Sequence, residues 1–297
     1  MKISAIGEIL YDVYSAGKIL GGAPFNFAYH IKQITGNSNF ISRIGDDSNG
    51  AEILDFLSDS GFNTNYISID RFHPTGTVMV QMLPDKTPKF EITENCAYDF
   101  MEVDLKINDL IENNTDLLYF GTLARRNYSS EKAVRSLLGK NIKYFCDLNI
   151  RQNFYSKEII EESLIASNVI KLNRNELALL GRIFCLPDDI EQAAIEILGI
   201  FDLDLICITL DIDGSLLYDG VTLDLHPSVQ ANIADTLGAG DAFSSILALG
   251  YLFKLDLHKI NSLANRFASE ICQIQGAIPS NNEIYQKYIR EFNNEKK

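Results

Sequence analysis

A run of small residues between two carboxylates is the part of this sequence best suited to chemistry. Residues 235–243 read Asp-Thr-Leu-Gly-Ala-Gly-Asp-Ala-Phe, and an apolar helical pattern follows them. Glycine and alanine at the mouth of a helix leave main-chain N–H groups uncovered, and these donors bind anions together with the helix dipole. Asp241 would lie in the first turn, where a carboxylate can take the proton of a hydroxyl that attacks phosphorus. The alternative interpretation is a glycine-rich turn whose Asp caps a buried helix.

Composition restricts the classes of partner. The chain has 297 residues, with 26 Lys and Arg against 40 Asp and Glu, which gives a net charge of −14. This acidic balance argues against binding to nucleic acid or to an anionic membrane, because phosphate-rich partners require clustered cations. An anionic substrate therefore needs positive potential supplied locally at its site. With 46% apolar and 22% charged residues, the chain is typical of a globular protein large enough for an ordinary enzyme core.

Cysteine usage and hydropathy point to the cytoplasm. The five cysteines are scattered and include no C-x-x-C pair, so we expect neither disulfides nor structural zinc. Glu8 comes too early in the chain for a signal peptide. The longest uncharged apolar-rich stretch, residues 242–253, is too short to cross a bilayer. We therefore expect a cytoplasmic protein.

Short apolar runs alternate with helical patterns, which predicts βαβ units and a mainly parallel sheet between layers of helices. The expected strands are Ile3–Ile6, Phe40–Ile44, Leu117–Phe120, Tyr144–Asp147, Val169–Leu172 and Leu205–Thr209. The expected helices are Pro24–Thr35, Asn49–Ser60, Ser129–Leu138, Asp188–Leu198 and Gly240–Phe253. Two segments with extended, alternating patterns, at about residues 11–20 and 65–98, interrupt this alternation of strands and helices, and they predict a small antiparallel lid. We expect a single domain over residues 1–297.

Ordered motifs along nearly the whole chain resemble those of the ribokinase-like, or PfkB, carbohydrate kinase family. Residues 235–241 are similar to its D-T-x-G-A-G-D motif and residues 21–26 to its G-G-x-x-x-N sugar motif. Residues 7–12 resemble the G-E-x-x-x-D opening of its fructokinase branch. Residues 40–47, 73–78, 147–151, 173–176 and 275–277 continue the match in order. The resemblance implies a three-layer αβα sandwich with a small antiparallel lid, and it favours a functional role for Asp241.

The resemblance assigns roles at the reacting end of the site. Asp241 would be the general base. The amides of an anion hole for the transferred phosphoryl group would come from Leu237, Gly238, Ala239 and Gly240. Asp12 and Asn26 are the expected partners of sugar hydroxyls, with Gly22 allowing close approach. A strand-end Asp and a helix-start Asn remain the structural alternatives.

The nucleotide side is less distinct. Asn173 and Glu176 resemble the family's N-x-x-E motif, which organises water around Mg²⁺ and phosphate, but the same spacing is a helix capping box. No residue is expected to ligate Mg²⁺ directly. Arg126 and Arg151 are candidates for neutralising phosphate charge, with a solvated surface role left open for Arg126. Asn265 is expected beside adenine or on a helix surface.

The phosphate-side loop departs from the family pattern. Relatives usually carry T-L-G-x-x-G, whereas residues 209–214 here read Thr-Leu-Asp-Ile-Asp-Gly. Thr209 and Gly214 keep the ends of the motif, but Asp211 and Asp213 put two carboxylates near the expected triphosphate. K⁺ is a further candidate ligand, because some relatives bind it through carbonyls at positions matching Asp235 and residues 276–280.

The family resemblance implies an ATP-dependent sugar kinase that phosphorylates an exocyclic hydroxyl of a ketose, with fructose the preferred substrate. The enzymatic alternatives are a 2-keto-3-deoxygluconate kinase, whose carboxylate substrate would use an arginine such as Arg126, and a ribokinase-type activity. The alternative from another class is a non-catalytic sugar or nucleotide sensor on the same fold. The exposed strands of the lid favour a homodimer.

Overall fold

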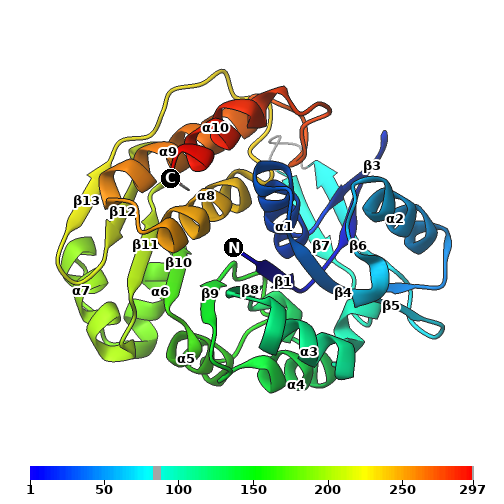
Figure 1. Cartoon of the computed structure of the whole chain (residues 1–297). Coiled ribbons are helices and arrows are strands. Elements are labelled where there is room, and N and C mark those ends of the chain that lie inside the picture. Colours follow the sequence, from blue (N-terminus) through cyan, green and yellow to red (C-terminus); the bar gives the residue numbers. More distant parts are fainter. Residues whose placement is uncertain (83–87, 296–297) are drawn as a thin grey trace.

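The computed structural model of the chain describes residues 1–82 and 88–295, so residues 83–87 of the expected lid lie outside the described residues. The described residues form two sheets and two layers of helices (Figure 1). The predicted three-layer sandwich with a second, smaller sheet is confirmed.

Among the described residues, the larger sheet has nine strands in the order β13–β12–β11–β10–β9–β8–β1–β4–β5. Their bounds are β1 (Ile3–Ile6), β4 (Asn39–Gly45), β5 (Ile67–Asp70), β8 (Leu117–Gly121), β9 (Lys143–Asp147), β10 (Val169–Asn173), β11 (Leu205–Thr209), β12 (Ser215–Tyr218) and β13 (Leu223–His226). Along this spatial order, every pair of neighbours from β5 at one edge to β11 is parallel, whereas β12 is antiparallel to both of its neighbours. Because the carboxyl ends of the parallel strands share one edge, the residues that follow them converge there.

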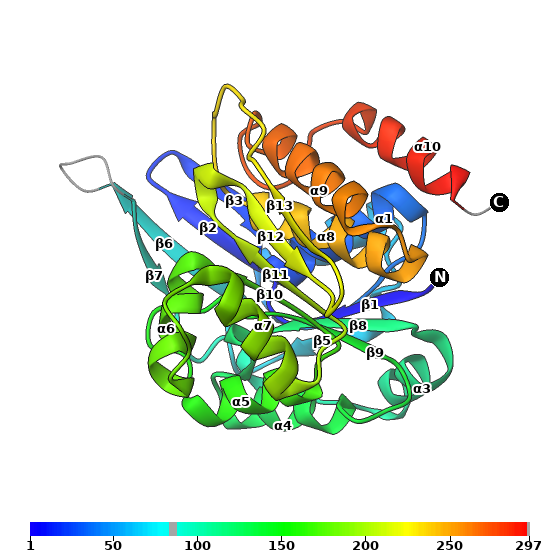
Figure 2. The same ribbon diagram turned by 90° about the vertical axis from the view of Figure 1, so that its left-hand side faces the viewer.

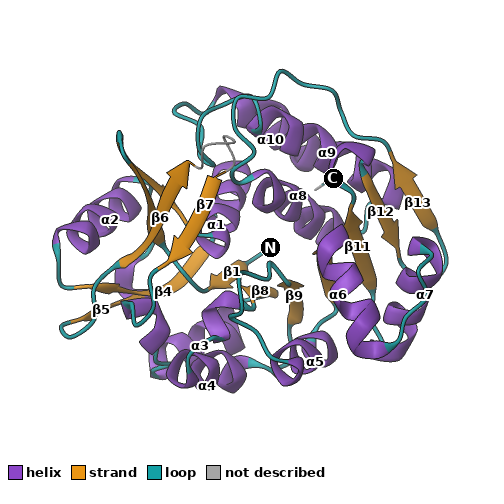
Figure 3. Cartoon of the chain, turned by 180° about the vertical axis from the view of Figure 1, so that it is seen from behind, coloured by secondary structure: helices purple, strands orange, loops and turns teal. Residues whose placement is uncertain are grey.

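Helices cover both faces of this sheet (Figures 1 and 3). One face carries α1 (Ala23–Thr35), α2 (Ser48–Asp59), α8 (Ala239–Phe253), α9 (Leu257–Ile271) and α10 (Gln286–Asn294). The other carries α3 (Leu105–Asn114), α4 (Tyr128–Leu137), α5 (Lys157–Ala166), α6 (Arg174–Phe184) and α7 (Ile190–Phe201). Short 3-10 helices are η1 (Thr64–Tyr66), η2 (Ala97–Phe100), η3 (Leu123–Arg125), η4 (Asp211–Asp213) and η5 (Glu283–Tyr285). None of the helices in the described ranges is both long and apolar enough to span a bilayer.

The central strands of the larger sheet contribute side chains to two hydrophobic cores, because successive side chains point to opposite faces of a sheet. Phe145 and Val169 join the core under α1, α8 and α9, whereas Cys146 and Ile170 join the core over the opposite helices. Helix α8 is the central element of the first core, and its residues 242–250 are all buried. This packing fixes the amino-terminal end of α8 at the edge of the sheet where the parallel strands end.

The smaller sheet projects from that same edge (Figure 2). Its strands, in spatial order, are β3 (Gly17–Gly21), β2 (Leu10–Tyr14), β6 (Gly76–Met82) and β7 (Pro88–Ile92). Two details differ from the expectation of an antiparallel lid over residues 65–98. The central pair, β2 and β6, is parallel, and residues 67–70 form β5, which pairs with β4 in the larger sheet instead. Burial of Ile67 against the main core accounts for the second difference.

Candidate active site

A cleft of about 1950 Å³ separates the smaller sheet from the carboxyl ends of the parallel strands. Thirteen of the fifteen residues expected at the site line it; Arg126 and Glu176 do not. The thirteen are Asp12, Gly22, Asn26, Arg151, Asn173, Thr209, Gly214, Leu237, Gly238, Ala239, Gly240, Asp241 and Asn265. Segments far apart in the chain therefore share one cavity, at the place where ligands bind in many α/β folds.

Asp241 meets the sugar-motif residue Asn26 directly. The side-chain amide of Asn26 donates a hydrogen bond of 2.8 Å to Asp241 Oδ2. Asn26 lies in the first half of α1 and is 3% exposed, and its own Oδ1 is buried without a hydrogen-bond partner. A buried acceptor left open at a cleft wall is a natural position for a ligand hydroxyl.

The environment of Asp241 suits a proton acceptor. Removal from bulk water raises the pKa of its carboxyl group from 3.8 to about 7, although the hydrogen bond from Asn26 opposes that rise. The Asp147 carboxylate also raises the pKa, whereas Lys171 and Arg151 lower it. A general base works best when its pKa lies near the working pH. Asp241 can therefore take a proton at neutral pH and release it afterwards.

The residues before Asp241 expose main-chain donors. Gly238 caps α8 with φ of 77°, and a Cβ placed there would lie 2.2 Å from Ala277 Cβ, so only glycine fits this turn. The amides of Gly238, Gly240 and Asp241 have no hydrogen-bond partner among the described residues. Ala239 N–H makes only a long bond of 3.4 Å to Thr236 O. These amides are free to hold an anion.

Leu237 differs from the expectation that its amide belongs to the anion hole. Its N–H donates to Asp235 Oδ1 at 3.0 Å. The other oxygen of Asp235 accepts the amide of Gly276 at 3.0 Å. Asp235 thus uses both oxygens to tie the loop before α8 to the Gly276 segment, and Leu237 shapes the hole without donating to it.

Asp12 and Gly22, the residues expected on the sugar side, line the cleft together with a third residue, Glu8. Asp12 is 6% exposed, and burial raises the pKa of its carboxyl group to about 6. Gly22 has φ of 114°, and a Cβ there would lie 2.5 Å from the carbonyl oxygen of Glu8, which explains the need for glycine. Glu8 also lines the cleft, its Oε2 lacks a hydrogen-bond partner, and burial raises its pKa to about 7. The sugar side is therefore rich in carboxyl groups.

Arg126 is a correction to the expected substrate contacts. Its side chain is 4% exposed, and its Nε and Nη2 donate to the two oxygens of Asp99 at 2.7 and 2.8 Å. A further bond of 2.6 Å reaches the carbonyl of Thr93. The guanidinium also lies over the rings of Tyr98 and Phe154. The charge of the Arg126 guanidinium is therefore already paired with Asp99. Arg126 joins η3 to η2 and to the end of β7, and it does not line the cleft.

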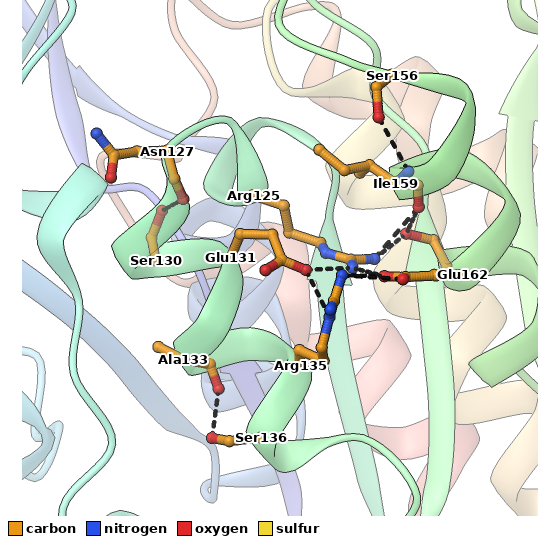
Figure 4. A network of polar contacts seen from close by, with 11 residues as sticks. Arg125, Asn127, Ser130, Glu131, Ala133, Arg135, Ser136, Ser156, Ile159 and Glu162 are labelled. Carbon is orange, nitrogen blue, oxygen red and sulfur yellow. Dashed lines mark hydrogen bonds and ion pairs between the residues drawn. The ribbon is translucent and has the colours of Figure 1, made fainter.

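Arg125, its neighbour, has other partners and holds η3 to α4 and α5 (Figure 4). Its guanidinium donates to Glu131 at 3.0 Å and Glu162 at 2.8 Å, and both carboxylates also bind Arg135. Arg125 is only 1% exposed. Adjacent arginines therefore anchor the same turn to different parts of the fold, and neither is a solvated surface residue.

Arg151 is, with Lys18, one of two exposed cations that line the cleft among the described residues. Arg151 follows β9 in a short segment in which Asn149 and Gln152 have positive φ values of 42° and 49°. Gln152 donates to the carbonyl of Phe90 in β7 at 2.8 Å, so the segment touches the smaller sheet. The positive charge of Arg151 lowers the pKa values of Glu8, Asp12 and Asp241.

Asn173 and Glu176 form the capping box that their spacing also allowed. Asn173 Oδ1 accepts the amide of Glu176 at 2.9 Å, and Glu176 Oε2 accepts the amide of Asn173 at 2.8 Å. Glu176 Oε1 accepts the amide of Ile150 at 2.7 Å. Both oxygens of Glu176 are thus engaged and buried, whereas Asn173 reaches the cleft.

The far end of the cleft is formed by Thr209, Gly214 and Asn265. Asn265 is 8% exposed, so the surface alternative for it is wrong. Its Nδ2 donates to Ser215 Oγ at 2.7 Å and to the carbonyl of Asn261 at 2.9 Å, which turns its Oδ1 away from these partners. Asp211 lines the cleft beside them, whereas Asp213 forms a surface ion pair with Arg174 at 2.6 Å.

Two charged residues at the floor of the cleft were missed by sequence reasoning. Lys171 and Asp147 form a buried ion pair of 2.8 Å, and Lys171 lines the cleft. The available signal was a single lysine within an otherwise apolar strand, Val169-Ile170-Lys171-Leu172. A buried, paired charge in a fully covered strand is rare enough to mark a functional position.

Comparison with known proteins agrees with this geometry. The family model described as pfkB family carbohydrate kinase matches residues 5–284. A Pyrococcus horikoshii protein described as an uncharacterized sugar kinase is 30% identical over 297 residues, covering 93% of this chain and 91% of the relative. A fructokinase of Escherichia coli is 25% identical over 301 residues, covering 93% of this chain and 95% of the relative.

Solved structures extend the likeness to three dimensions. The Pyrococcus horikoshii sugar kinase in complex with ATP superposes with a TM-score of 0.80 at 27% identity, covering 98% of this chain and 99% of the other. A Vibrio cholerae fructokinase double mutant with bound fructose, ADP and potassium ion also has a TM-score of 0.80, at 20% identity, covering 98% and 97% of the two chains. At that identity the second likeness bears on the fold alone.

Proposed function

This chain belongs to the pfkB family of carbohydrate kinases, and from that premise we propose that it is an ATP-dependent ketose kinase that phosphorylates an exocyclic hydroxyl of fructose. The observation that carries the proposal is the meeting of Asp241 with Asn26 at the mouth of α8, beside unpartnered amides. One group there can accept a hydroxyl proton, and the other groups can hold a phosphoryl anion. A sensor of sugars or nucleotides would need neither function, so this constellation favours catalysis over the sensor alternative.

In the proposed reaction, Asp12 and Asn26 orient the sugar and Asp241 accepts the proton of its exocyclic hydroxyl. The hydroxyl oxygen forms a bond to the γ-phosphorus of ATP as the bond from that phosphorus to the β–γ bridging oxygen breaks, which releases ADP. The amides of Gly238, Gly240 and Asp241 would stabilise the oxygens of the phosphoryl group in transfer. A single donor in such a hole contributes about 3 kcal/mol to lowering the barrier in other enzymes.

A neutral ketose fits the sugar side better than 2-keto-3-deoxygluconate does. Glu8 and Asp12 present two carboxyl groups to the cleft, and these would repel a substrate carboxylate. Arg126, the expected partner of a sugar acid, is already paired with Asp99. Lys18, Arg151 and Lys171 line the cleft and are the cations that could favour the acid, so the substrate panel below includes 2-keto-3-deoxygluconate.

Mg²⁺ fits this site as an ion that arrives with the nucleotide. The described residues contain no group of three or more His, Cys, Asp or Glu side chains placed to hold a metal. Glu176 is buried, accepts a main-chain amide with each oxygen and does not line the cleft, so it would act on the ion through water, and Asn173 offers an amide at the cleft. When bound, the ion would neutralise phosphate charge, as Mg²⁺ usually does in phosphoryl transfer. K⁺ would fit near Asp235 and Gly276, whose loops are already joined.

A substrate panel tests the proposal. Fructose, ribose and 2-keto-3-deoxygluconate would each be supplied with ATP and with GTP, and ADP or GDP release would be measured with wild type and with Asp241→Asn. We expect fructose to give the highest kcat/KM and the variant to lose about 10²–10⁴-fold in kcat. Preferential use of 2-keto-3-deoxygluconate would refute the ketose assignment, and undiminished turnover by the variant would remove Asp241 from the base role.

We also propose a homodimer formed through the smaller sheet. Its outer strands β3 and β7 each have one unpaired side, and Met79 and Phe90 expose 43% and 42% of their surfaces. Exposed strand edges and apolar side chains favour pairing with a second copy. Light scattering coupled to gel filtration measures the mass in solution, and a mass of 33.3 kDa, that of one chain, would contradict the dimer.

A further inference from the structure

The buried lysine of β10 lies directly below the proposed anion hole. Lys171 and Asp147 are register partners on the parallel strands β10 and β9. Their immediate neighbours on the strands, Ile170 and Cys146, face the opposite core, so both charged side chains point to the α8 side of the sheet. Lys171 is 6% exposed and reaches the cleft. Helix α8 thus has a cation under its amino-terminal turn.

Asp147 is held so that it can orient this cation. Its Oδ2 accepts hydrogen bonds from Lys171 Nζ at 2.8 Å, Ser244 Oγ at 2.8 Å and Tyr119 OH at 3.2 Å. The single hydroxyl hydrogen of Ser244 is shared between Asp147 Oδ2 and the carbonyl oxygen of Gly240, 2.9 Å away, which links the cluster to the glycine turn. The carboxylate is therefore fixed from β8, β10 and α8 at once.

The ammonium group keeps donors to spare. Lys171 Nζ carries three N–H bonds, and its hydrogen bond to Asp147 is the single one that the described residues provide. A Cβ built on Gly240 would lie 3.4 Å from Nζ, which places the ammonium beside the turn that would receive the phosphoryl group. An alanine at position 240 would therefore place a methyl group in contact with the ammonium group.

Stability alone does not account for this pair. A buried ion pair gains little over apolar side chains of similar size, because both charges must leave water. Two residues earlier on the same strands, Phe145 and Val169 enter this layer, and so does Cys207, the register partner of Lys171 on β11, which shows that apolar side chains fit there. A lysine in this layer is explained if its charge serves the reaction.

We propose that Lys171 is a catalytic cation whose Nζ contacts an oxygen of the phosphoryl group during transfer, with Asp147 as the residue that positions it. This inference rests on the proposed function of the same cleft. The proton of the sugar hydroxyl goes to Asp241, and Lys171 keeps its own protons throughout. Its charge offsets the negative charge that spreads over the phosphoryl oxygens in the transition state.

The electrostatics of the pair keep the lysine charged. Burial lowers the pKa of Lys171, but the Asp147 carboxylate and its hydrogen bond together raise it above the usual value. The other carboxylate that raises it is Glu176, which packs behind β10. Lys171 in turn lowers the pKa of Asp241, as does Arg151.

The first variant to test is Lys171→Met, with the substrate that wild type uses best. We expect kcat to fall about 10²–10³-fold, the effect of removing one transition-state donor, while KM for sugar and for ATP stays within about threefold. Lys143→Met is the matched control, because Lys143 also pairs with an aspartate, Asp204, at 2.8 Å, but at the other end of the sheet. The control should retain wild-type kcat.

A double variant separates catalysis from a merely structural role. Lys171→Met alone leaves Asp147 buried without its counterion, so lost activity could reflect poor folding. Lys171→Met with Asp147→Asn removes both charges, which should restore the melting temperature. If Lys171 contacts the phosphoryl group, the folded double variant keeps the low kcat of Lys171→Met. It should also bind ADP with aluminium fluoride at least tenfold more weakly than wild type does, whereas its affinity for ADP alone should be unchanged. Recovery of kcat to within threefold of wild type would overturn the proposal.

The proposal and the assignment of the base can fail separately. Asp241→Asn with full activity, alongside a Lys171→Met variant that loses kcat, would refute the role of Asp241 and leave the cation in place. The reverse result, with a sensitive Asp241 and an active double variant, would leave the kinase site as described and reduce Lys171 to a structural counterion.

Discussion

The hydrogen bond between Asn26 and Asp241 allows a quantitative test of the base. Replacing Asn26 with leucine keeps a side chain of similar size and removes the donor 2.8 Å from Asp241 Oδ2. This donor stabilises the ionised carboxylate and so lowers its pKa. Removal must therefore shift the pKa upward. The other charged neighbours, Asp147, Lys171 and Arg151, stay in place.

The size of the shift follows from the bond and its surroundings. A hydrogen bond to a charged group contributes about 1.5–3 kcal/mol, and water in the cleft would replace part of it, leaving about 1.4 kcal/mol or about one pKa unit. The pKa of Asp241, which burial has already raised to about 7, would then move to about 8. At pH 7 the ionised fraction falls from about one half to about one tenth, so that activity falls about fivefold through protonation alone. At pH 9 this loss nearly vanishes.

The assay is the pH profile of kcat/KM, whose acid limb reports the free enzyme's base. Lost sugar contacts lower the height of the profile, whereas only a change in the base moves its inflection. Asn113→Leu is the matched control, since Asn113 donates to Asp109 at 2.9 Å on the exposed face of α3. An acid limb that stays at the wild-type pH in Asn26→Leu, or moves to lower pH, would refute the assignment of that limb to Asp241.

Two further predictions concern the scaffold. His30 is fully buried, and burial lowers its pKa from 6.5 to about 3. Below pH 6.5 the imidazole therefore binds a proton in the unfolded chain but not in the folded one, so the free energy of unfolding falls as the pH falls. Relative to His30→Leu, urea unfolding of wild type should lose about 2 kcal/mol between pH 7.5 and pH 5, and parallel curves for the two proteins would contradict this account. Gly238→Ala should abolish activity and lower the melting temperature, because its Cβ would collide with Ala277. Gly139 also has a positive φ, of 79°, but a Cβ there would meet no atom within 4 Å. Gly139→Ala should therefore cost only about 1–2 kcal/mol of backbone strain and keep the wild-type kcat. Equal effects of the two alanines would show that strain, not the collision, matters at position 238.

Local patterns predicted much of the scaffold correctly. All five expected helices and all six expected strands occur, with ends that match or differ by at most three residues, because periodicity and capping depend on near neighbours. Other elements were not predicted. Helix α3 has the polar sequence LKINDLIENN and turns only a narrow apolar side to the core. Strands β12 and β13 have four residues each, and β13 is the edge strand of the larger sheet.

Pairing between distant segments could not be read from local patterns. Strand β5 lies in the segment expected to form the lid, but the larger sheet takes it because it completes the pairing of β4. Arg126 forms its ion pair with Asp99, which lies 27 residues away in the sequence, and this pairing depends on how η2 and η3 pack. A bidentate salt bridge leaves no mark in the spacing of its residues.

The chain's own order of residues determined the site's chemical inventory: the glycine turn, the carboxylate in the next helical turn, the amide in the sugar motif and the capping box of Asn173. These depend on contacts within a few residues and survive without knowledge of the fold. Only the tertiary structure decided that Asn26 meets Asp241 across 215 residues and that the register of β9 and β10 pairs Lys171 with Asp147. The physical reason is that a side chain's charge state and partners are set by burial and by the neighbours that packing brings to it.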